Sequence, residues 1–594
     1  MKRNSLNSET QTTIAPNLYL PDDCWQSIFK LLINNKNTDN NTDDNNNNNR
    51  RYLHTLSVVS KQFLSVTNRL PFSLKITHST LLPFLLPRLF HRFQNLTSLD
   101  LTSIDSKSTD LDALLNQIST FSFNLKSLKL SNQSTIPTNG LRALSKKITT
   151  LTSLSCSGIE SLRNNDIILI SNCFPFLEEL DVSNVEKRVH VVVNAKFLKL
   201  PKLRKVNLSG HYYLNDSLLL HLCKSCEFLE EIVMLNSPFV TIDHIASAIR
   251  ERPSLRSLSF TKLMGIIQNY NFFYNSLVSL KGLTCLDLSY SYVKDELLLS
   301  IAEKDLPLRR LILQGCYGYG YAGIFNLLYK CRFLQYLDLQ NADFFNDWHF
   351  FQLSLFLRDL VYINISKCRK LTNIALFALL KNCASLSEVR MEYTHIGIIS
   401  GEDSSNLKNL VVNHQLKSLY LANNMWLMDK DINMLVSACP NLQLLDLSSC
   451  DEISEKCIGK VLRKGSKIRH LNLACCLGLK LHRVYFNIST LEVLNLSESR
   501  IDDRSLYAIS TGCLGLLQLD LGHCYDITEK GVMQVVENCT QLREINLQDC
   551  LNVASDVVEL MIFIRPSLKK ITAPPFYNCN DKRKLFLRQG CLVC

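Results

Sequence analysis

The sequence contains no long hydrophobic run. Its most apolar stretch, Leu81–Phe90, is interrupted by Pro83 and Pro87, and it is far shorter than the roughly 20 residues that a membrane-spanning helix needs. The first residues, Met1–Asn17, are polar and lack the apolar segment of a secretory signal. We therefore expect neither a membrane span nor secretion, and we expect the protein in the cytoplasm, the nucleus or both.

The sequence also lacks a concentrated block of charge of one sign. It contains 65 lysines and arginines against 54 aspartates and glutamates, a net charge of +11 spread over 594 residues. A nucleic-acid-binding domain would carry a basic stripe with stacking aromatic residues among the cations. We expect no nucleic-acid partner.

Motifs for catalysis, metal binding and phosphate binding are missing as well. The 13 histidines form no H-x-x-x-H pair, and no cluster of cysteine and histidine has zinc-ligand spacing. The glycine-containing segment Gly315–Gly320 lacks the Lys-Ser/Thr ending of a phosphate-binding loop. We expect a non-enzymatic chain without a metal or cofactor.

What the sequence does contain is a repeat, shown most plainly by Asn441–Cys450 (NLQLLDLSSC). Leu442, Leu445 and Leu447 form the frame L-x-x-L-x-L, and near-copies of it occur nineteen times, with 26 residues in twelve of the eighteen intervals. A fixed period of this length predicts a leucine-rich-repeat solenoid. The frames begin at Leu96, Leu125, Leu151, Leu177, Leu203, Leu229, Leu255, Leu283, Leu308, Leu334, Leu360, Leu386, Leu416, Leu442, Ile468, Leu491, Leu516, Leu542 and Leu568.

Twelve of the 22 cysteines occupy two fixed positions in this repeat, so they do not indicate a disulfide framework. A residue held at one repeat position is there for packing, and a buried free cysteine behaves as a small hydrophobic residue. Together with the missing secretion signal, this predicts a reducing compartment. Eight residues after the first frame leucine lie Cys316, Cys368, Cys450, Cys476, Cys524 and Cys550, and three residues before it lie Cys226, Cys331, Cys383, Cys439, Cys513 and Cys539.

The repeat predicts an α/β solenoid with a parallel sheet on the concave side and helices on the convex side. In each frame the L-x-L core is expected to be a short strand whose leucines point inward, while the intervening residues face the concave surface. Phe72–Ile76 is expected to supply a first, irregular strand. The unit Leu516–Thr540 resembles the cysteine-containing class of leucine-rich repeats, which occurs in F-box/leucine-rich-repeat proteins.

The region before the repeats resembles an F-box. Pro21 with the two following aspartates suits the start of a helix, and a second helical region surrounds Leu56–Phe63 (LSVVSKQF). The resemblance covers residues 18–70, and it departs from the family in the asparagine-rich segment 34–50, which we expect to be a disordered insertion. We expect disorder in residues 1–17, the solenoid over residues 71–573 and a tail over residues 574–594.

This resemblance implies a substrate-recognition subunit that binds a Skp-type adaptor and, through it, a cullin-based ubiquitin ligase. Two alternatives from the residues stay open: the helices serve only as a cap on a protein-binding scaffold, or the chain is a small-molecule co-receptor within the same ligase. The residues expected to build the F-box and its adaptor face are Leu20, Pro21, Ile28, Phe29, Leu32, Leu56, Val59 and Phe63.

The substrate surface is expected where the repeats depart from their own pattern. The position between the last two frame leucines holds aspartate or asparagine in most units, which suits a solvated concave surface, but large residues replace them between Leu308 and Leu427. Exposed aromatic and arginine side chains are typical of binding hot spots. The alternative is that Tyr319, Phe345 and Leu427 occupy a buried position and their neighbours vary neutrally. The expected substrate-binding residues are Ile312, Tyr317, Phe344, Arg369, Arg390, Tyr420 and Trp426.

The chain ends in Cys591-Leu592-Val593-Cys594, which has the form of a prenylation signal with Cys591 as the acceptor. Upstream basic residues, Lys582–Lys584 and Arg588, would assist membrane binding. The alternatives are an ordinary flexible tail and a pair of thiols. A membrane partner is expected only if this cysteine carries a lipid.

Overall fold

The computed structural model describes residues 20–34, 55–70, 72–76, 88–91, 95–104, 110–160, 162, 164–183, 200–210, 216–236, 241–262, 270–398, 412–484, 490–577, 585–586 and 589–594. Of the segments 1–17 and 34–50, for which we expect disorder, only Asn34 is among these residues, and it is the last residue of a helix. The chain forms two compact units, Met1–Val182 and Ser183–Cys594.

The first unit begins with a pair of helices, α1 (Asp22–Asn34) and α3 (Lys61–Arg69). Phe29 of α1 is buried against Val66 and Leu70, and Trp25 and Phe63 pack on the same cluster. The ring centroids of Trp25 and Phe63 are 4.6 Å apart, and those of Phe29 and Phe63 are 5.0 Å apart. The pair is therefore held by an aromatic core.

Asp22 connects the two helices through polar contacts. Its carboxylate accepts a hydrogen bond from Gln62 Nε2 at 3.0 Å and forms an ion pair with Arg69. These bonds lower the pKa of Asp22, because both favour the charged carboxylate. The acid that suits the helix start in the sequence also ties α1 to α3.

After the helices, the first unit continues with parallel strands that pair in chain order. The expected first strand is confirmed as β1, which pairs irregularly with β2 at Phe72. Its elements are β1 (Phe72–Lys75), β2 (Leu96–Asp100), α5 (Leu111–Ile118), β3 (Ser127–Lys129), α6 (Thr138–Ser145), β4 (Ser153–Ser155), α7 (Asn164–Cys173) and β5 (Glu179–Asp181).

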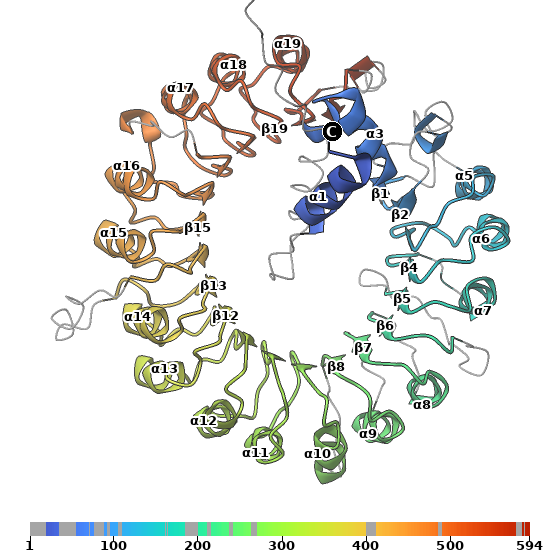
Figure 1. Ribbon diagram of the computed structural model, residues 1–594. Coiled ribbons are helices and arrows are strands. Elements are labelled where there is room, and N and C mark those ends of the chain that lie inside the picture. Colours follow the sequence, from blue (N-terminus) through green and yellow to red (C-terminus); the bar gives the residue numbers. More distant parts are fainter. Residues whose placement is uncertain are drawn as a thin grey trace, which may run out of the picture. The chain divides into compact units, whose positions relative to one another are not determined.

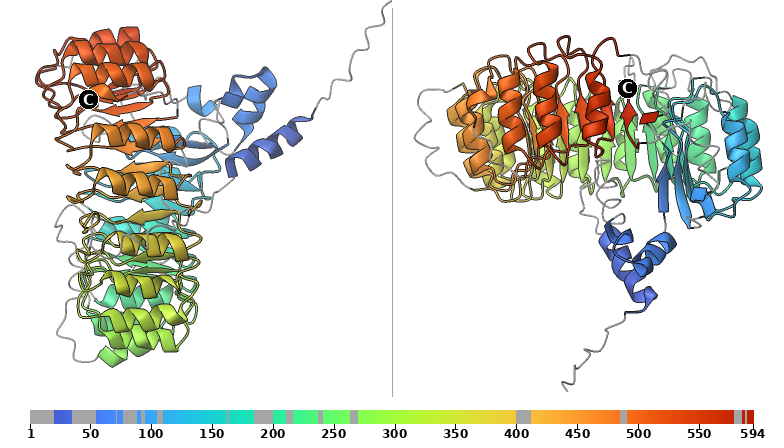
Figure 2. Two further views of the ribbon diagram at one scale, coloured as in Figure 1. Left: turned by 90° about the vertical axis from the view of Figure 1, so that its left-hand side faces the viewer. Right: turned by 90° about the horizontal axis from the view of Figure 1, so that it is seen from above.

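The second unit is a solenoid in which short parallel strands line the inner side of a curved arc and helices cover its outer side (Figures 1 and 2). The predicted fold class is confirmed. Its strands are β6 (Lys205–Asn207), β7 (Glu231–Met234), β8 (Ser257–Phe260), β9 (Cys285–Asp287), β10 (Arg310–Ile312), β11 (Tyr336–Asp338), β12 (Tyr362–Asn364), β13 (Glu388–Arg390), β14 (Ser418–Tyr420), β15 (Leu444–Asp446), β16 (His470–Asn472), β17 (Val493–Asn495), β18 (Gln518–Asp520), β19 (Glu544–Asn546), β20 (Lys570–Thr572) and β21 (Leu592–Val593). Its helices are α8 (Asp216–Ser225), α9 (Ile242–Arg250), α10 (Tyr270–Val278), α11 (Asp295–Glu303), α12 (Tyr321–Lys330), α13 (Asp347–Ser354), α14 (Asn373–Asn382), α15 (Asp429–Ala438), α16 (Glu455–Lys464), the 3₁₀ turn η3 (Leu481–Arg483), α17 (Asp503–Gly512), α18 (Glu529–Asn538) and α19 (Val557–Ile564).

The frame leucines form the core of this unit. Leu445 pairs in register with Leu419 on one side and Leu471 on the other, and all three side chains are at most 1% exposed. Full burial of one such leucine contributes roughly 1.5–3 kcal/mol. Because side chains alternate along a strand, the residues flanking each buried leucine face the concave surface.

The aspartates and asparagines of the frame have a structural role that the sequence did not reveal. In Asp446 the carboxylate accepts hydrogen bonds from the Ser448 amide at 2.9 Å and the Ser448 hydroxyl at 2.7 Å, which fixes the turn after the strand. Asp338 and Asn364 are only 5% and 7% exposed, so these positions are less solvated than we expect from the sequence. The same bond to the amide two residues later is made by Asp100, Asn207, Asp287, Asp338, Asn364, Asn472, Asn495, Asp520 and Asn546.

The repeated cysteines also link neighbouring repeats. Cys450 Sγ lies 3.3 Å from the carbonyl oxygen of Leu421, and Cys476 Sγ lies 3.2 Å from that of Leu447. Both thiols are fully buried. A cysteine at this position fills the core and donates a weak hydrogen bond to the preceding repeat.

A second polar connection joins consecutive helices. Asp503 at the start of α17 accepts bonds from the amide (2.8 Å) and hydroxyl (2.6 Å) of Thr528, the N-cap of α18. Asp347 binds Thr372 in the same way, and Asp429 binds Ser454. In each pair, the carboxylate at the start of one helix therefore orients the N-cap residue of the next helix.

The C-terminal residues differ from the tail that we expect after Ala573. β21 pairs with β20 in parallel, and the backbone N–H of Ala573 donates to the carbonyl of Cys594 at 2.9 Å. Phe586, Cys591 and Val593 are buried. The sheet therefore extends to the last residues, because a further strand satisfies the backbone groups at the edge of β20.

We predict that Asp503→Ala lowers the free energy of unfolding by about 2 kcal/mol, because two charge-assisted hydrogen bonds to Thr528 are lost. Urea unfolding followed by circular dichroism measures this change. Asp526→Ala is the matched control, since Asp526 is exposed in the neighbouring turn. An equal midpoint for Asp503→Ala and the wild type would contradict the assigned role.

Candidate functional surfaces

The concave face of the second unit carries a stack of aromatic and cationic side chains. Arg310, Tyr336 and Tyr362 occupy the same register position on β10, β11 and β12. The Arg310 guanidinium carbon lies 3.5 Å from the centroid of the Tyr336 ring, and the Tyr336 and Tyr362 rings stack with centroids 3.9 Å apart at an angle of 4°. Stacked rings present a flat, pre-formed contact area.

The next two strands add a second cation–π pair. Arg390 of β13 and Tyr420 of β14 are paired in register, and the Arg390 guanidinium carbon lies 4.1 Å from the centroid of the Tyr420 ring. Arg390 Nε also contacts Glu388 Oε1 at 2.9 Å. We call Arg310, Tyr336, Tyr362, Arg390 and Tyr420 the tyrosine–arginine platform.

Burial and neighbouring groups set the protonation states of several platform side chains. Burial raises the pKa of the Tyr362 and Tyr420 phenols, so both remain neutral at physiological pH. Burial opposes the charge of Arg390, but the Glu388 carboxylate that contacts its Nε favours this charge, and the pKa of Arg390 is raised. The platform thus combines the neutral rings of Tyr362 and Tyr420 with the charged guanidinium of Arg390.

The structure brings together some of the predicted substrate residues and separates others. Arg390 and Tyr420 are in contact on the concave face, whereas Tyr317, Arg369 and Trp426 are exposed in the loops after the strands. Ile312 was expected to be exposed, but it is only 9% exposed, so it cannot offer a contact surface. It lies between Asp287 and Asp338 in the sheet register.

Phe344 is also less exposed than we expect for a substrate-binding residue. Its ring meets the Tyr319 ring edge-to-face at 5.2 Å and lies 4.3 Å from the Phe345 ring, so it is half-buried. Tyr319, Phe345 and Leu427 are buried, at 7%, 0% and 0% exposure. The alternative drawn from the sequence is therefore right about these three positions.

Three residues of the platform were missed in the sequence. Arg310, Tyr336 and Tyr362 stand directly before the middle frame residue, whereas the prediction rests on the position after it and on two positions in the following loop. Both positions face the concave surface, because each flanks a buried residue by one step along the strand. The successive large residues at this second position were the signal that could have identified them.

The helical pair exposes an apolar surface on the side away from its core. Leu20, Ile28 and Val59, all predicted, are 39%, 37% and 63% exposed, and Leu31 and Val58, which were missed, are both 70% exposed. Exposed aliphatic side chains grouped on a small helical unit are typical of a protein-binding site.

Other predicted adaptor residues belong to the interior. Phe29 is 1% exposed and cannot contact a partner, because it fills the core between the helices. Leu56 and Phe63 are half-buried against the same core. Phe29, Leu56 and Phe63 therefore support the fold of the pair. Pro21 is exposed directly before α1, and the side chain of Leu32 lies outside the described residues.

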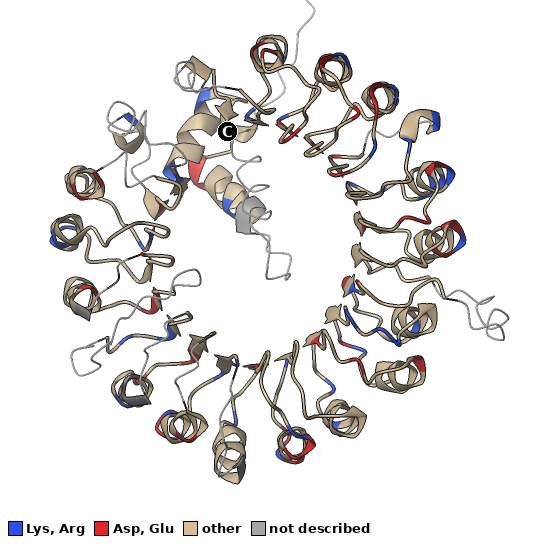
Figure 3. Ribbon diagram, turned by 180° about the vertical axis from the view of Figure 1, so that it is seen from behind, with Lys and Arg blue, Asp and Glu red and all other residues tan. Residues whose placement is uncertain are grey.

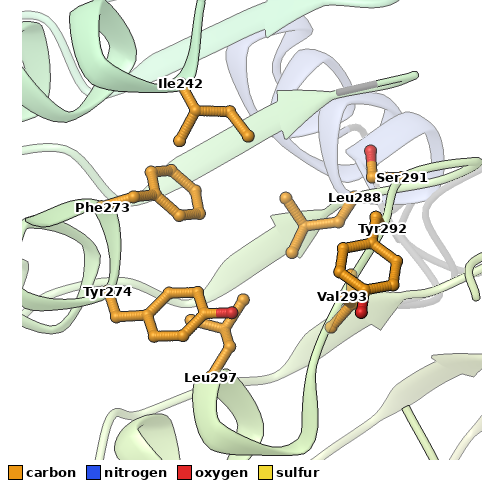
Figure 4. Close-up of a pocket in the computed structure, with 8 residues that line it drawn as sticks. All are labelled: Ile242, Phe273, Tyr274, Leu288, Ser291, Tyr292, Val293 and Leu297. Atoms are coloured by element: carbon orange, nitrogen blue, oxygen red, sulfur yellow. The ribbon is translucent and has the colours of Figure 1, made fainter. Parts of the chain in front are cut away.

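One cavity lies between α9, α10 and the segment before α11, lined by apolar side chains including Phe273, Leu288 and Leu297 (Figure 4). Its volume of about 10 Å³ holds at most one water molecule. It is too small for a ligand, since small-molecule pockets are on the order of 300–1,000 Å³.

Charged residues of both signs are distributed along the helices and strands (Figure 3). Within the described part of the chain, no group of three or more His, Cys, Asp or Glu side chains is arranged to hold a metal ion. Among the same residues, no helix is both long enough and apolar enough to cross a membrane.

Prenylation of Cys591 stays a prediction. The Cys591 side chain is 1% exposed, and burial raises the pKa of its thiol to about 11. Transfer of a lipid would require the last residues to leave the sheet, because β21 follows this cysteine directly.

The comparison with known proteins identifies F-box proteins with leucine-rich repeats. F-box/LRR-repeat protein 4 of Bos taurus is 28% identical over 191 residues, 31% of this chain and 31% of its own length. The chain is similar to F-box/LRR-repeat proteins. An F-box/FBD/LRR-repeat protein of Arabidopsis thaliana is 26% identical over 149 residues, 24% of this chain and 34% of its own length. The match thus spans about a third of the length of these relatives, and no protein-family model matches the chain.

Two solved structures match the chain at low sequence identity. The yeast Rad7–Elc1 complex includes a chain that matches with 17% identity and a TM-score of 0.39, covering 86% of this chain and 94% of that one. The TLR13–ssRNA13 complex gives 17% identity and a TM-score of 0.42, with coverages of 82% and 72%.

We predict that the repeat cysteines are unreactive in the folded protein. Burial raises the pKa of Cys368, Cys383, Cys450 and Cys539 to about 12, so almost no thiolate forms at pH 8. Titration with a thiol reagent at pH 8 should modify the exposed Cys24 and Cys594 first, and the repeat cysteines only after denaturant is added. Mass spectrometry locates the modified residues, and rapid modification of Cys450 in the native chain would show that the core is open.

Proposed function

We propose that the protein is a non-catalytic substrate-recognition subunit of a ubiquitin ligase of the Skp–cullin–F-box type. The observation that carries the proposal is a compact helical pair with an exposed aliphatic surface at the start of a leucine-rich-repeat chain, in a protein similar to F-box/LRR-repeat proteins. The helical pair binds a Skp-type adaptor, and the solenoid binds the target protein.

The adaptor surface in this proposal consists of Leu20, Ile28, Leu31, Val58 and Val59. These side chains remain exposed because Phe29, Val66 and Leu70 already supply the core of the pair. An aliphatic surface of this kind gains binding free energy when a partner removes it from water.

We expect Leu31→Glu combined with Val59→Glu to weaken adaptor binding at least about tenfold, because a charge replaces the centre of an apolar contact. Isothermal titration of the full chain with a purified Skp-type adaptor measures the loss. Lys30→Glu is the matched control, since Lys30 is exposed on the same helix. If the wild-type chain shows no binding, the alternative of a scaffold without ligase function is favoured.

The substrate surface in this proposal is the tyrosine–arginine platform with the exposed Trp426 beside it in sequence. The platform spans five neighbouring strands, β10–β14, and supplies aromatic and guanidinium groups, which are frequent in protein-binding hot spots. In a ligase, binding here places a target lysine near the ubiquitin-charged enzyme, so this chain contributes proximity and not bond chemistry.

We expect Arg390→Glu, Tyr420→Ala and Trp426→Ala together to abolish target capture and leave adaptor binding unchanged. Arg390→Lys alone should reduce capture by about tenfold, since lysine keeps the charge but loses the planar contact with Tyr420. Quantitative proximity labelling in proteasome-inhibited cells measures capture, and Gln518→Ala on β18 is the control at an exposed position of the same face. Undiminished labelling in the triple variant would place the target elsewhere.

A further inference from the structure

The outer surface of α12 and α13 carries apolar side chains where a solenoid helix normally faces water. Trp348 and Phe351 of α13 and its C-cap residue Leu355 follow one another at i, i+3 and i+7 and are 61%, 44% and 54% exposed. Tyr329 at the end of α12 and Phe333 after it are 46% and 69% exposed. We call these five residues the outer aromatic patch.

On α16, by contrast, the exposed positions are charged and hold Lys456, Lys460, Arg463 and Lys464. A charged outer face is the ordinary pattern of an amphipathic helix whose apolar side is buried. Apolar side chains are exposed on other outer helices too, for example Leu560 and Phe563 on α19. The outer aromatic patch combines five of them on and beside two adjoining helices, and exposed apolar areas of this kind mark interaction sites.

The rings beneath the patch are fixed before any partner binds. Tyr321 stacks on His349 with centroids 4.2 Å apart and contacts Trp348 at 6.0 Å. Phe356 meets Phe325 and Tyr329 edge-to-face, each at 5.5 Å. These contacts bridge α12 and α13, which lie side by side on the outer face (Figure 1). Because the rings are already ordered, binding loses little side-chain entropy.

Cations lie at one end of the patch. Lys330 Nζ and the Arg332 guanidinium carbon are 5.9 Å and 5.5 Å from the centroid of the Tyr329 ring. Arg358 is also exposed, next to the exposed Asp359. The helices α12, α13 and α14 contain a single acidic residue, Asp347, and its carboxylate is engaged by Thr372.

We propose that the outer aromatic patch binds an amphipathic α-helix of a partner protein, with apolar residues at i, i+3 or i+4, and i+7 and acidic residues at the end that meets Lys330 and Arg332. The distance from Trp348 to Leu355 along α13 corresponds to about 10 Å, or two helical turns, which is the reach of such a motif. The charge complementarity selects an acidic helix. The cations stand at one end of an elongated apolar strip and do not surround it, which favours a helix over a lipid surface.

A display library tests this proposal directly. The library presents one solvent-facing helix of a fixed helical scaffold with randomised apolar, acidic and basic positions, and it is selected against the full-length chain. We expect enriched sequences to share the i, i+3/i+4, i+7 apolar pattern with Glu or Asp at one end. Binding of a selected helix, measured by fluorescence anisotropy, should weaken at least about tenfold for Trp348→Ala with Phe351→Ala. Lys330→Glu with Arg332→Glu should weaken the same helix in a salt-dependent manner.

Tyr507→Ala is the matched control, since Tyr507 is 56% exposed on the outer face of α17, and circular dichroism confirms that each variant is folded. Enrichment of basic or unpatterned helices, or binding that survives both double variants, would overturn the proposal. Two further results would also overturn it by assigning the patch to another occupant. These are patch-dependent sedimentation with vesicles of phosphatidylcholine and phosphatidylserine, and a dimer in light scattering that Phe351→Ala dissociates.

Discussion

Parallel pairing of very short strands is the constraint on which the second unit depends. A strand of three residues has too few hydrogen bonds to be stable alone, so each is held by a neighbour on both sides and by the buried residue at its centre. Polar side chains of the repeat also connect each strand or helix to its neighbours. Asp446 fixes the turn after its strand, Cys450 reaches back to the preceding repeat, and Asp503 orients the next helix. The strand β21 pairs in the same parallel way with the edge of β20.

These roles explain where the surface can vary. The residues on either side of a buried leucine are on the concave side of the strand, so tyrosine and arginine can replace smaller residues there. In the tyrosine–arginine platform the replacements stabilise one another, because Arg390 contacts both Tyr420 and Glu388. On the outer face, rings of α12 and α13 likewise contact each other, while Trp348 and Tyr329 keep much of their surface exposed. The tyrosine–arginine platform lies on the concave side of the solenoid, and the outer aromatic patch lies on its convex side (Figure 1).

In the helical pair, the F-box-like sequence motif does not by itself show which residues can contact a partner. The motif residues divide into Phe29 and Phe63, which make the core, and Ile28 and Val59, which stay exposed. Helical periodicity identifies the residues at the centre of the buried face of a helix. Whether the residues at the border of this face are buried or exposed depends on how closely the second helix packs. For this reason Leu31 and Val58, which are the most exposed, were not recognised from the sequence.

The sequence by itself determined the repeat, the strand positions, the inward leucines and the packing cysteines, because each follows from a period that recurs along the chain. It also identified Arg390 and Tyr420 as departures from that period, whereas their contact is seen only in the structure. Only the tertiary structure decided which departures are surface and which are core. Ile312 is buried and Phe344 half-buried, whereas Arg310, Tyr336 and Tyr362 join the platform. The physical reason is that exposure depends on side chains in adjacent repeats, about 26 residues away in sequence but one strand spacing away in space.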